Sequence, residues 1–262
     1  MDTNDAAERF LDALQEPTYD DESGPEMAPT RLARAFAQAV GVDGAALSIH
    51  EGAGLRTPIG ASDRTTARAE QLQFTTGDGP CLRAHDTGRA IVFDLEDIER
   101  NWPELHAALL GETPYRAVFS LPLAPPLGPT VIVDLYAREP DTLTAVPRDD
   151  VEAALLVLTE ELVRSSGSAP VEEETRWWDS PDARRRSRVW QATGVATVAL
   201  GLDVVDTLTV LRAHAFATGR VVDDVADDIV EGRLDPASLR DPDPRTTSGP
   251  EPGSEPGSEP AG

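Results

Sequence analysis

Residues 184–234 read RRRSRVWQATGVATVALGLDVVDTLTVLRAHAFATGRVVDDVADDIVEGRL and decide the fold of the C-terminal part of the chain. Just before this stretch, Ser180, Pro181 and Asp182 form a helix start, with a hydroxyl N-cap, a proline at the first helical position and an early acid. Gly201 and Gly219 then interrupt the apolar pattern, which predicts short turns between helices. We therefore expect an all-α three-helix unit over residues 181–235.

The first of these helices carries two distinct faces. At about 100° per residue, one face collects the expected core residues, which are Val189, Thr193, Ala196 and Leu200. Arg184, Arg188 and Gln191 fall together on another face. A run of arginines is either a solvated helix surface or a phosphate contact, because guanidinium groups can fork onto phosphate and stack on unpaired bases.

Three short segments of this stretch, 191–194, 211–215 and 223–230, resemble the ANTAR domain, an RNA-binding module of transcription antiterminators. The resemblance implies binding to paired stem-loops in nascent RNA. It implies that the contacting residues are Arg184, Arg185, Arg188, Gln191, Thr193, Gly194 and Arg212. A mid-helix glycine costs about 1 kcal/mol relative to alanine, so Gly194 suggests close approach of another backbone, either RNA or a neighbouring helix.

Net charge opposes this assignment. The chain carries −24 at neutral pH, which repels nucleic acid at long range. Residues 181–200 nevertheless hold four arginines and one acid, whereas four aspartates gather at 223–228. The arginine cluster favours RNA binding. The acid cluster favours an alternative, a ligand-sensing protein-interaction regulator that docks to another protein without binding RNA.

Upstream, residues 28–165 are long enough for one domain with a substantial core. Their pattern predicts helices near 30–40, 62–73, 103–110 and 148–163, and strands near 44–50, 55–60, 90–93, 117–123 and 130–136. Few of these helices alternate strictly with strands. The pattern therefore favours an α+β fold, with an antiparallel sheet flanked by helices.

This upstream region resembles a GAF domain, a sensor-type α+β fold. The matching words are residues 77–82 (GDGPCL), 102–103 (WP), 120–123 (SLPL) and 134–136 (DLY). The resemblance implies a pocket for an unknown small-molecule signal between the sheet and the helices over one face. Candidate lining residues are Gln73, Phe74, Asp78, Cys81, His85 and Trp102, although the aromatic pair also suits an ordinary core.

Together the two resemblances imply a GAF sensor that controls an ANTAR unit, in a signal-responsive transcription antitermination regulator. Two RNA hairpins suit two ANTAR units, so the resemblance also implies a homodimer. We expect no enzymatic activity, because the four histidines lack metal or nucleophile spacing and no phosphate loop or dinucleotide fingerprint is present. We expect neither a cofactor nor a metal site.

Cys81 is the only cysteine, which excludes an internal disulfide. It is either a redox-sensing thiol or a small buried hydrophobe. The stripe Val151, Leu155, Leu158 and Leu162 fits either a short coiled coil or packing on its own sheet. The adjacent Trp177 and Trp178 either stack on RNA bases or pack the linker.

The remaining segments are expected to organise the chain. Residues 1–27 form an acidic extension with one short helix near 6–14, and residues 166–180 form a linker. Residues 236–262 are rich in Pro, Gly, Ser and Glu, so we expect a disordered tail. No apolar run reaches the roughly 18 residues of a membrane span, and the N-terminus is acidic, so we expect a cytoplasmic protein without membrane contact.

Overall fold

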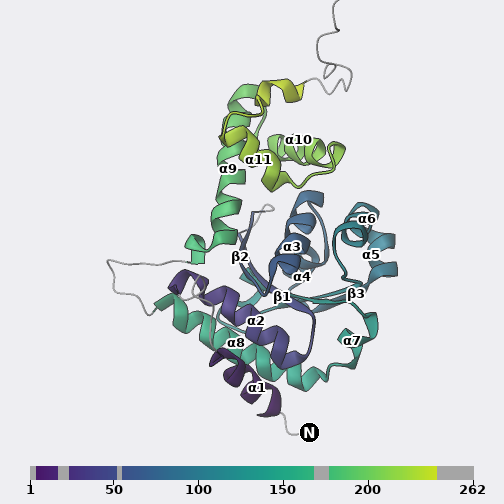
Figure 1. Ribbon diagram of the computed structural model, residues 1–262, viewed down its shortest axis with the longest axis vertical. Helices are drawn as coiled ribbons and strands as arrows, with labels where there is room; N and C mark the ends of the chain where they lie inside the picture. Colours follow the sequence, from purple (N-terminus) through teal and green to yellow (C-terminus); the bar gives the residue numbers. More distant parts are fainter. Residues whose placement is uncertain (1–3, 17–23, 52–54, 168–176, 241–262) are drawn as a thin grey trace, which may run out of the picture.

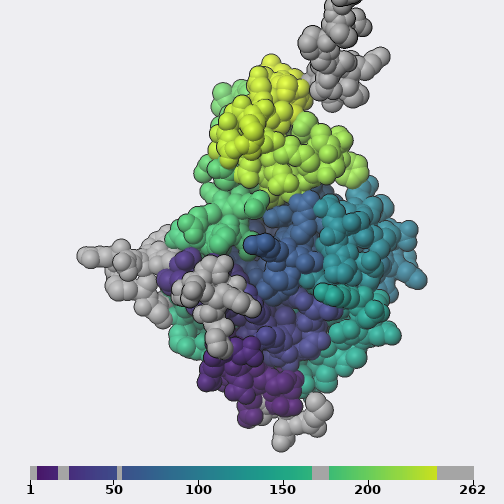
Figure 2. Space-filling model, viewed as in Figure 1, coloured from purple at the N-terminus to yellow at the C-terminus, as the bar shows by residue number. Residues whose placement is uncertain are grey.

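The computed structural model describes residues 4–16, 24–51, 55–167 and 177–240. An antiparallel sheet lies between two layers of helices, and a three-helix unit packs on one end of this body (Figure 1). The expectation of an α+β fold with an antiparallel sheet is confirmed. Figure 2 shows the C-terminal helices, in green and yellow, seated directly on the upstream domain.

Five strands form the sheet in the order β2-β1-β5-β4-β3, and every pair is antiparallel. The strands are β1 (Gly44–His50), β2 (Arg56–Ala61), β3 (Ile91–Asp94), β4 (Ala117–Pro122) and β5 (Val131–Ala137). Leu47 and Leu121 both lie opposite Val133, which makes an apolar row on one face. Because side chains alternate along a strand, the next row lies on the other face, where Asp134 stands between Ala46 and Ser120.

The apolar face is covered by α2 (Ala28–Val40) and α8 (Arg148–Gly167), and α1 (Asn4–Leu14) packs on these two helices. Phe10 of α1, from the expected N-terminal extension, is fully buried against Phe36 of α2. In α8, Leu158 and Leu162 of the apolar stripe are fully buried in this same core. The stripe therefore packs within its own domain, and the coiled-coil interpretation is wrong.

The opposite face of the sheet carries α3 (Arg64–Thr76), α4 (Pro80–Thr87), α5 (Leu95–Asn101) and α6 (Pro103–Glu112). Asp63 caps α3, since its carboxylate accepts hydrogen bonds from the amides of Thr65 at 2.7 Å and Thr66 at 2.9 Å. Short elements complete the domain, namely the 3-10 turns η2 (Pro25–Met27) and η3 (Gly128–Thr130) and the helix α7 (Pro140–Ala145).

The C-terminal unit consists of α9 (Pro181–Leu200), α10 (Val204–Ala217) and α11 (Val222–Val230). The helix start at Ser180 and the breaks at Gly201 and Gly219 predict these three helices. The Ser180 hydroxyl accepts a hydrogen bond from the Ala183 amide at 3.1 Å and caps α9. Gly201 ends α9 with a φ of 69°, a conformation that favours glycine. The unit has its own apolar core, but the ring of Phe74 from α3 also belongs to it.

Two 3-10 turns flank this unit, η4 (Trp177–Asp179) before α9 and η5 (Pro236–Arg240) after α11. Residues 236–240 were expected to begin the disordered tail. Instead, η5 packs against α9, and the Arg240 guanidinium donates to the Ala199 carbonyl. The rest of the expected tail, residues 241–262, and most of the expected linker, residues 168–176, lie outside the described residues.

Within the described ranges, no single helix combines the length and the apolar character that crossing a bilayer requires. The pair α9 and α10 meets both criteria only when taken together, and it bends by 104° between the two helices.

Candidate functional site

The helix α3 lies between the sheet and the C-terminal unit and contributes side chains to both (Figure 1). Toward the sheet it faces a group of buried polar side chains, which we call the ionisable cluster. Its members are Arg56, Glu70, Gln73, Ser120, Asp134 and Tyr136. All six are at most 3 % exposed, so their hydrogen bonds form away from water.

An arginine and two carboxylates form the charged centre of the cluster. The Arg56 guanidinium donates to Glu70, and its Nη2 atom lies 3.4 Å from Oδ2 of Asp134. The Ser120 hydroxyl donates to the other oxygen of Asp134. Burial raises the pKa of Asp134, while Arg56 and Ser120 oppose this rise.

Gln73 and Tyr136 complete the cluster from α3 and β5. The Gln73 amide nitrogen donates to the Tyr136 hydroxyl at 2.6 Å and lies 3.4 Å from Asp134. The Tyr136 hydroxyl in turn donates to Glu70. Every group of the cluster has a hydrogen-bond partner except Nε of Arg56, which has none among the described residues. A nearly satisfied buried network of this kind holds α3 on the sheet.

Cys81 and two histidines border the cluster. Burial raises the pKa of the Cys81 thiol to about 12, so the group is a thiol at neutral pH. Nε2 of His50 forms a hydrogen bond with the Ser48 hydroxyl at 3.1 Å. The His50 ring also stacks on that of His85, with 4.8 Å between centroids. Burial, followed by the charge of Arg56, lowers the pKa of His50 to about 2. The surroundings of Cys81 therefore match those of a packed side chain.

The six residues predicted to line a signal pocket do not line one cavity. Gln73 is in the cluster, and Cys81 and His85 border it. Phe74 points to the C-terminal unit instead, because successive residues of a helix lie on different faces. Asp78 is exposed and accepts from the Gly79 amide at 2.7 Å. Trp102 is buried against Phe93, which matches its alternative reading as a core aromatic.

On its other side, α3 is held by the C-terminal unit through what we call the arginine clasp, formed by Phe74, Arg186, Arg212 and Asp223. The guanidinium carbon of Arg186 lies 3.2 Å from the centre of the Phe74 ring, and that of Arg212 lies 4.7 Å away. Arg212 Nε also donates to the Phe74 carbonyl at 3.0 Å. At the next residue of α3, the Val222 amide donates to the Thr75 hydroxyl at 3.0 Å. Cation–ring contacts strengthen on desolvation, so the clasp is a strong junction.

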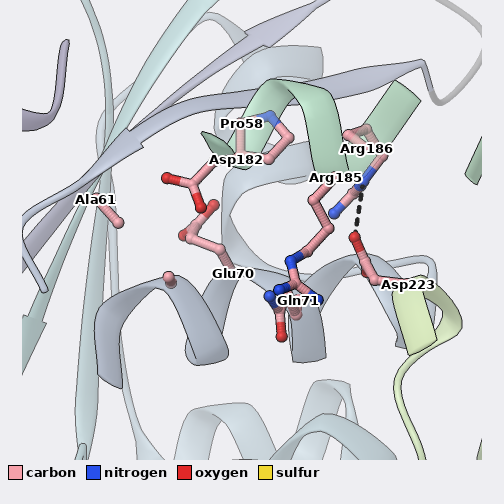
Figure 3. Close-up of a pocket in the computed structure, with 9 residues that line it drawn as sticks. Pro58, Ala61, Glu70, Gln71, Asp182, Arg185, Arg186 and Asp223 are labelled. Atoms are coloured by element: carbon pink, nitrogen blue, oxygen red, sulfur yellow. Dashed lines mark ion pairs between the residues drawn. The ribbon is translucent and has the colours of Figure 1, made fainter. Parts of the chain in front are cut away.

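The clasp contains a buried ion pair between Arg186 and Asp223 (Figure 3). Arg186 and Asp223 are each 1 % exposed, with 3.5 Å between Nε and Oδ1. Arg186 Nη1 also donates to the Arg56 carbonyl at 3.4 Å, which connects α9 to β2, the strand that contributes Arg56 to the ionisable cluster. Burial lowers the pKa of Arg186 to about 10, which still leaves it charged at neutral pH.

This ion pair is incompletely satisfied. Nε of Arg186 and Oδ2 of Asp223 have no hydrogen-bond partner among the described residues. Beside them lies a cavity of about 10 Å³ that is also lined by Glu70 and Asp182. Burial raises the pKa of Asp182, whose side chain faces the same space (Figure 3).

The seven residues predicted to bind RNA are not gathered on one free surface. Arg184, Gln191 and Gly194 are exposed on α9. Thr193 is buried and donates to the Val189 carbonyl at 2.7 Å, and Arg212 is part of the clasp. A Cβ added to Gly194 would meet nothing within 4 Å among the described residues. Of the two alternatives for Gly194, the close approach of a neighbouring helix is therefore not found among the described residues, and the close approach of RNA stays a prediction.

The other two predicted RNA contacts pair with the acids of α11. Arg185 lies 3.8 Å from Asp224, and Arg188 contacts Asp227 and, at 2.9 Å, Glu231. These acids therefore pair with two of the arginines that were predicted to contact RNA.

The sequence interpretation missed Arg186, the largest fully buried side chain of the described chain. A signal for it was present. Arg186 lies three residues before Val189 and seven before Thr193, which places it on the apolar stripe of α9 rather than on the arginine face. Its partner Asp223 could not be found this way, because the crossing of α9 and α11 is a tertiary feature.

Trp177 packs the chain, whereas Trp178 is partly exposed, so stacking of Trp178 on RNA bases stays a prediction. Trp177 Nε1 donates to the Ser165 hydroxyl at 3.3 Å and so joins η4 to the end of α8. Trp178 is 39 % exposed and lines a groove of about 410 Å³ together with Leu55 and Trp190. Among the described residues, no group of three or more His, Cys, Asp or Glu is placed to hold a metal ion.

No protein-family model matches this chain, and no curated protein matches it either.

Proposed function

We propose that this chain is a signal-responsive transcription antitermination regulator, in which a GAF-like sensor controls an ANTAR-like RNA-binding unit. The observation that best supports this proposal is that α3 contacts both the ionisable cluster and the C-terminal unit. Glu70 and Gln73 of this helix belong to the ionisable cluster, whereas Phe74 and Thr75 hold the C-terminal unit. A change at the sheet is thus transmitted to the clasp within one helical turn.

The proposed output is the exposed side of α9. Arg184 and Gln191 are accessible in this arrangement, but Arg188 must leave Asp227 and Glu231 before it can contact a phosphate. Arg212 is likewise held on Phe74. The described arrangement is therefore the state of low RNA affinity. A signal that shifts α3 loosens the clasp and frees these arginines for paired stem-loops in nascent RNA.

Binding of a paired-hairpin RNA over a series of salt concentrations tests this proposal. Asp227→Ala with Glu231→Ala frees Arg188 and is expected to tighten binding. Arg184→Ala is expected to weaken it and to reduce the slope of log affinity against log salt by about 0.7 to 0.9, the contribution of one phosphate contact. Arg100→Ala, an exposed arginine on α5, serves as the matched control and should leave the slope unchanged. Equal slopes for all folded variants would reject RNA binding.

The second candidate is a protein-interaction regulator without RNA affinity. The pairing of Arg185 and Arg188 with the acids of α11 favours it, because it leaves little free positive charge. In that case even the variant that frees Arg188 binds no hairpin RNA at low salt, while its folding is intact by circular dichroism.

A further inference from the structure

A groove of about 410 Å³ lies where the adjoining ends of β1 and β2 meet η4 and α9. Glu51 and Leu55 lie at these strand ends, and the Glu51 amide donates to the Leu55 carbonyl at 2.9 Å. Trp178 lines the groove from η4, and Ser187 and Trp190 line it from α9. Sites for small molecules have volumes of about 300 to 1,000 Å³. The groove therefore has room for such a molecule, whereas the cavity of about 10 Å³ beside the buried ion pair does not.

The charge of the groove excludes anionic ligands. Glu51 is the single charged side chain among the seven described residues that line it. This residue is exposed, and its carboxylate has no ion-pair partner in the described part of the chain. It repels phosphate and carboxylate groups, and the net charge of −24 on the whole chain adds to that repulsion. A nucleotide is thus disfavoured, whereas a cation is attracted.

Two indole rings determine which kind of cation fits. Among aromatic side chains, tryptophan attracts cations most strongly, and cages of such rings bind quaternary ammonium groups. Trp178 is 39 % exposed and Trp190 is partly buried, so both rings leave surface open to the groove. Leu55 adds an aliphatic wall, which favours apolar substituents on the ligand. We propose that this groove binds a small organic cation, a protonated or quaternary amine with apolar substituents.

Such a ligand contacts both parts of the molecule. Thr57 belongs to β2 of the sheet, whereas Ser187 and Trp190 belong to α9 of the C-terminal unit. Trp190 also packs edge-on against Phe74 of the clasp, with 6.0 Å between the ring centroids. A ligand favours the state that offers its contacts. The bound cation therefore stabilises the arrangement in which α9 lies against β2 and Phe74 is held by the clasp.

This arrangement is also the one in which Arg188 is paired with acids of α11 and Arg212 is held on Phe74. An organic cation in the groove is therefore expected to lower the affinity for RNA. That consequence rests on the proposed function, whereas the binding site itself does not.

Choline and its uncharged analogue dimethylbutanol, in which a carbon atom replaces the quaternary nitrogen, are matched probes of the site. Saturation-transfer NMR follows the methyl protons of either probe on the full-length protein at constant ionic strength. Choline is expected to bind with a dissociation constant on the order of 1 mM, as two desolvated cation–ring contacts allow. Dimethylbutanol should bind at least about tenfold more weakly. Equal binding of the two probes would overturn the proposal, as would choline binding that does not saturate.

Substitutions of exposed residues locate the site. Trp178→Leu keeps an apolar wall but removes one ring, and should weaken choline binding by about tenfold or more. Glu51→Gln should weaken it by up to about fivefold, the factor of an exposed ion pair. Glu99→Gln removes an exposed carboxylate of α5 and serves as the matched control, with unchanged choline binding. Circular dichroism checks that each variant is folded. If Glu99→Gln weakens choline binding as much as Glu51→Gln does, net charge explains the effect and the site is refuted.

RNA binding separates the site from its consequence. Saturating choline should lower the affinity of the unaltered chain for a paired-hairpin RNA, but not that of Trp178→Leu. A chain that binds choline but never RNA supports the site and rejects the proposed function. An RNA affinity that choline leaves unchanged would overturn the regulatory consequence. If choline does not bind and Trp178→Leu alone abolishes RNA binding, Trp178 stacks on RNA and the proposal is refuted.

Discussion

The buried pair of Arg186 and Asp223 is expected to show strong energetic coupling. Each side chain is 1 % exposed, and each already has one unpaired atom. Removing one partner of a buried pair leaves the other charge uncompensated, which costs about 3 to 5 kcal/mol. Arg186→Met and Asp223→Leu should therefore each lower the unfolding temperature by roughly 6 to 20 °C, at about 2 to 4 °C per kcal/mol for a chain of this size.

The double variant should be much less affected than the sum of the two single variants. Replacing both members of a buried pair by apolar side chains is neutral or stabilising by about 1 to 4 kcal/mol. Against this stands the lost contact of Arg186 with Phe74, worth about 2 kcal/mol in a desolvated site. We expect the double variant within about 2 kcal/mol of the unaltered protein, hence a coupling of at least about 4 kcal/mol.

Urea unfolding followed by tryptophan fluorescence measures all four proteins of this cycle. The exposed pair of Arg100 and Asp97 provides the control, because the same substitutions there should change stability by at most about 1 kcal/mol. Additive losses at Arg186 and Asp223, or losses as small as those of the control, would refute the buried junction between α9 and α11.

Three further outcomes follow from the site. His50 stays neutral in the folded protein but takes a proton near pH 6.5 in the unfolded chain. The free energy of unfolding should therefore fall as pH decreases below about 6.5, by up to about 1.4 kcal/mol per pH unit. His50→Gln should reduce that slope when urea unfolding is measured at a series of pH values. Cys81 should resist a thiol reagent in the native protein and react only in denaturant, because its thiol is buried and its pKa is raised; rapid native labelling would revive the redox-sensing hypothesis. Phe74→Leu removes both arginine–ring contacts, each worth up to about 2 kcal/mol when desolvated. It should also shift the fluorescence of Trp190, whose ring packs edge-on against Phe74. An unchanged spectrum and unchanged stability would show that the clasp is weak.

The C-terminal helices were predictable because the residues at their own ends determine where they begin and end. Ser180 and Asp203 cap two helices, and Gly201 has the left-handed conformation that ends one of them. The strand β1 was predictable from the alternation of its residues, and β5 was predictable from the apolar residues around Asp134. The helix α4 was missed, since eight residues with little apolar periodicity after a Gly-Asp-Gly-Pro sequence read as a turn.

The site itself was only partly accessible from sequence. Asp134 and Ser120 lie opposite each other because of the register in which β4 and β5 pair. That register cannot be derived from the distance between the two residues in the sequence. Arg56 enters the same cluster from the edge strand β2. Charge counting identified the basic α9 and the acidic α11 but treated them as independent surfaces. It could not show that Arg188 and Asp227 neutralise each other, because that depends on how the helices cross.

The place of Phe74 has a consequence for how information would flow through the molecule. Its helix is anchored in the ionisable cluster, while its ring completes the core of the C-terminal unit, so the two parts are linked thermodynamically. A coupling free energy between two sites acts equally in both directions. If a signal raises RNA affinity by loosening the clasp, bound RNA must raise the affinity for that signal by the same factor. A cell rich in target transcripts would then respond to lower concentrations of the signal than a cell that has few.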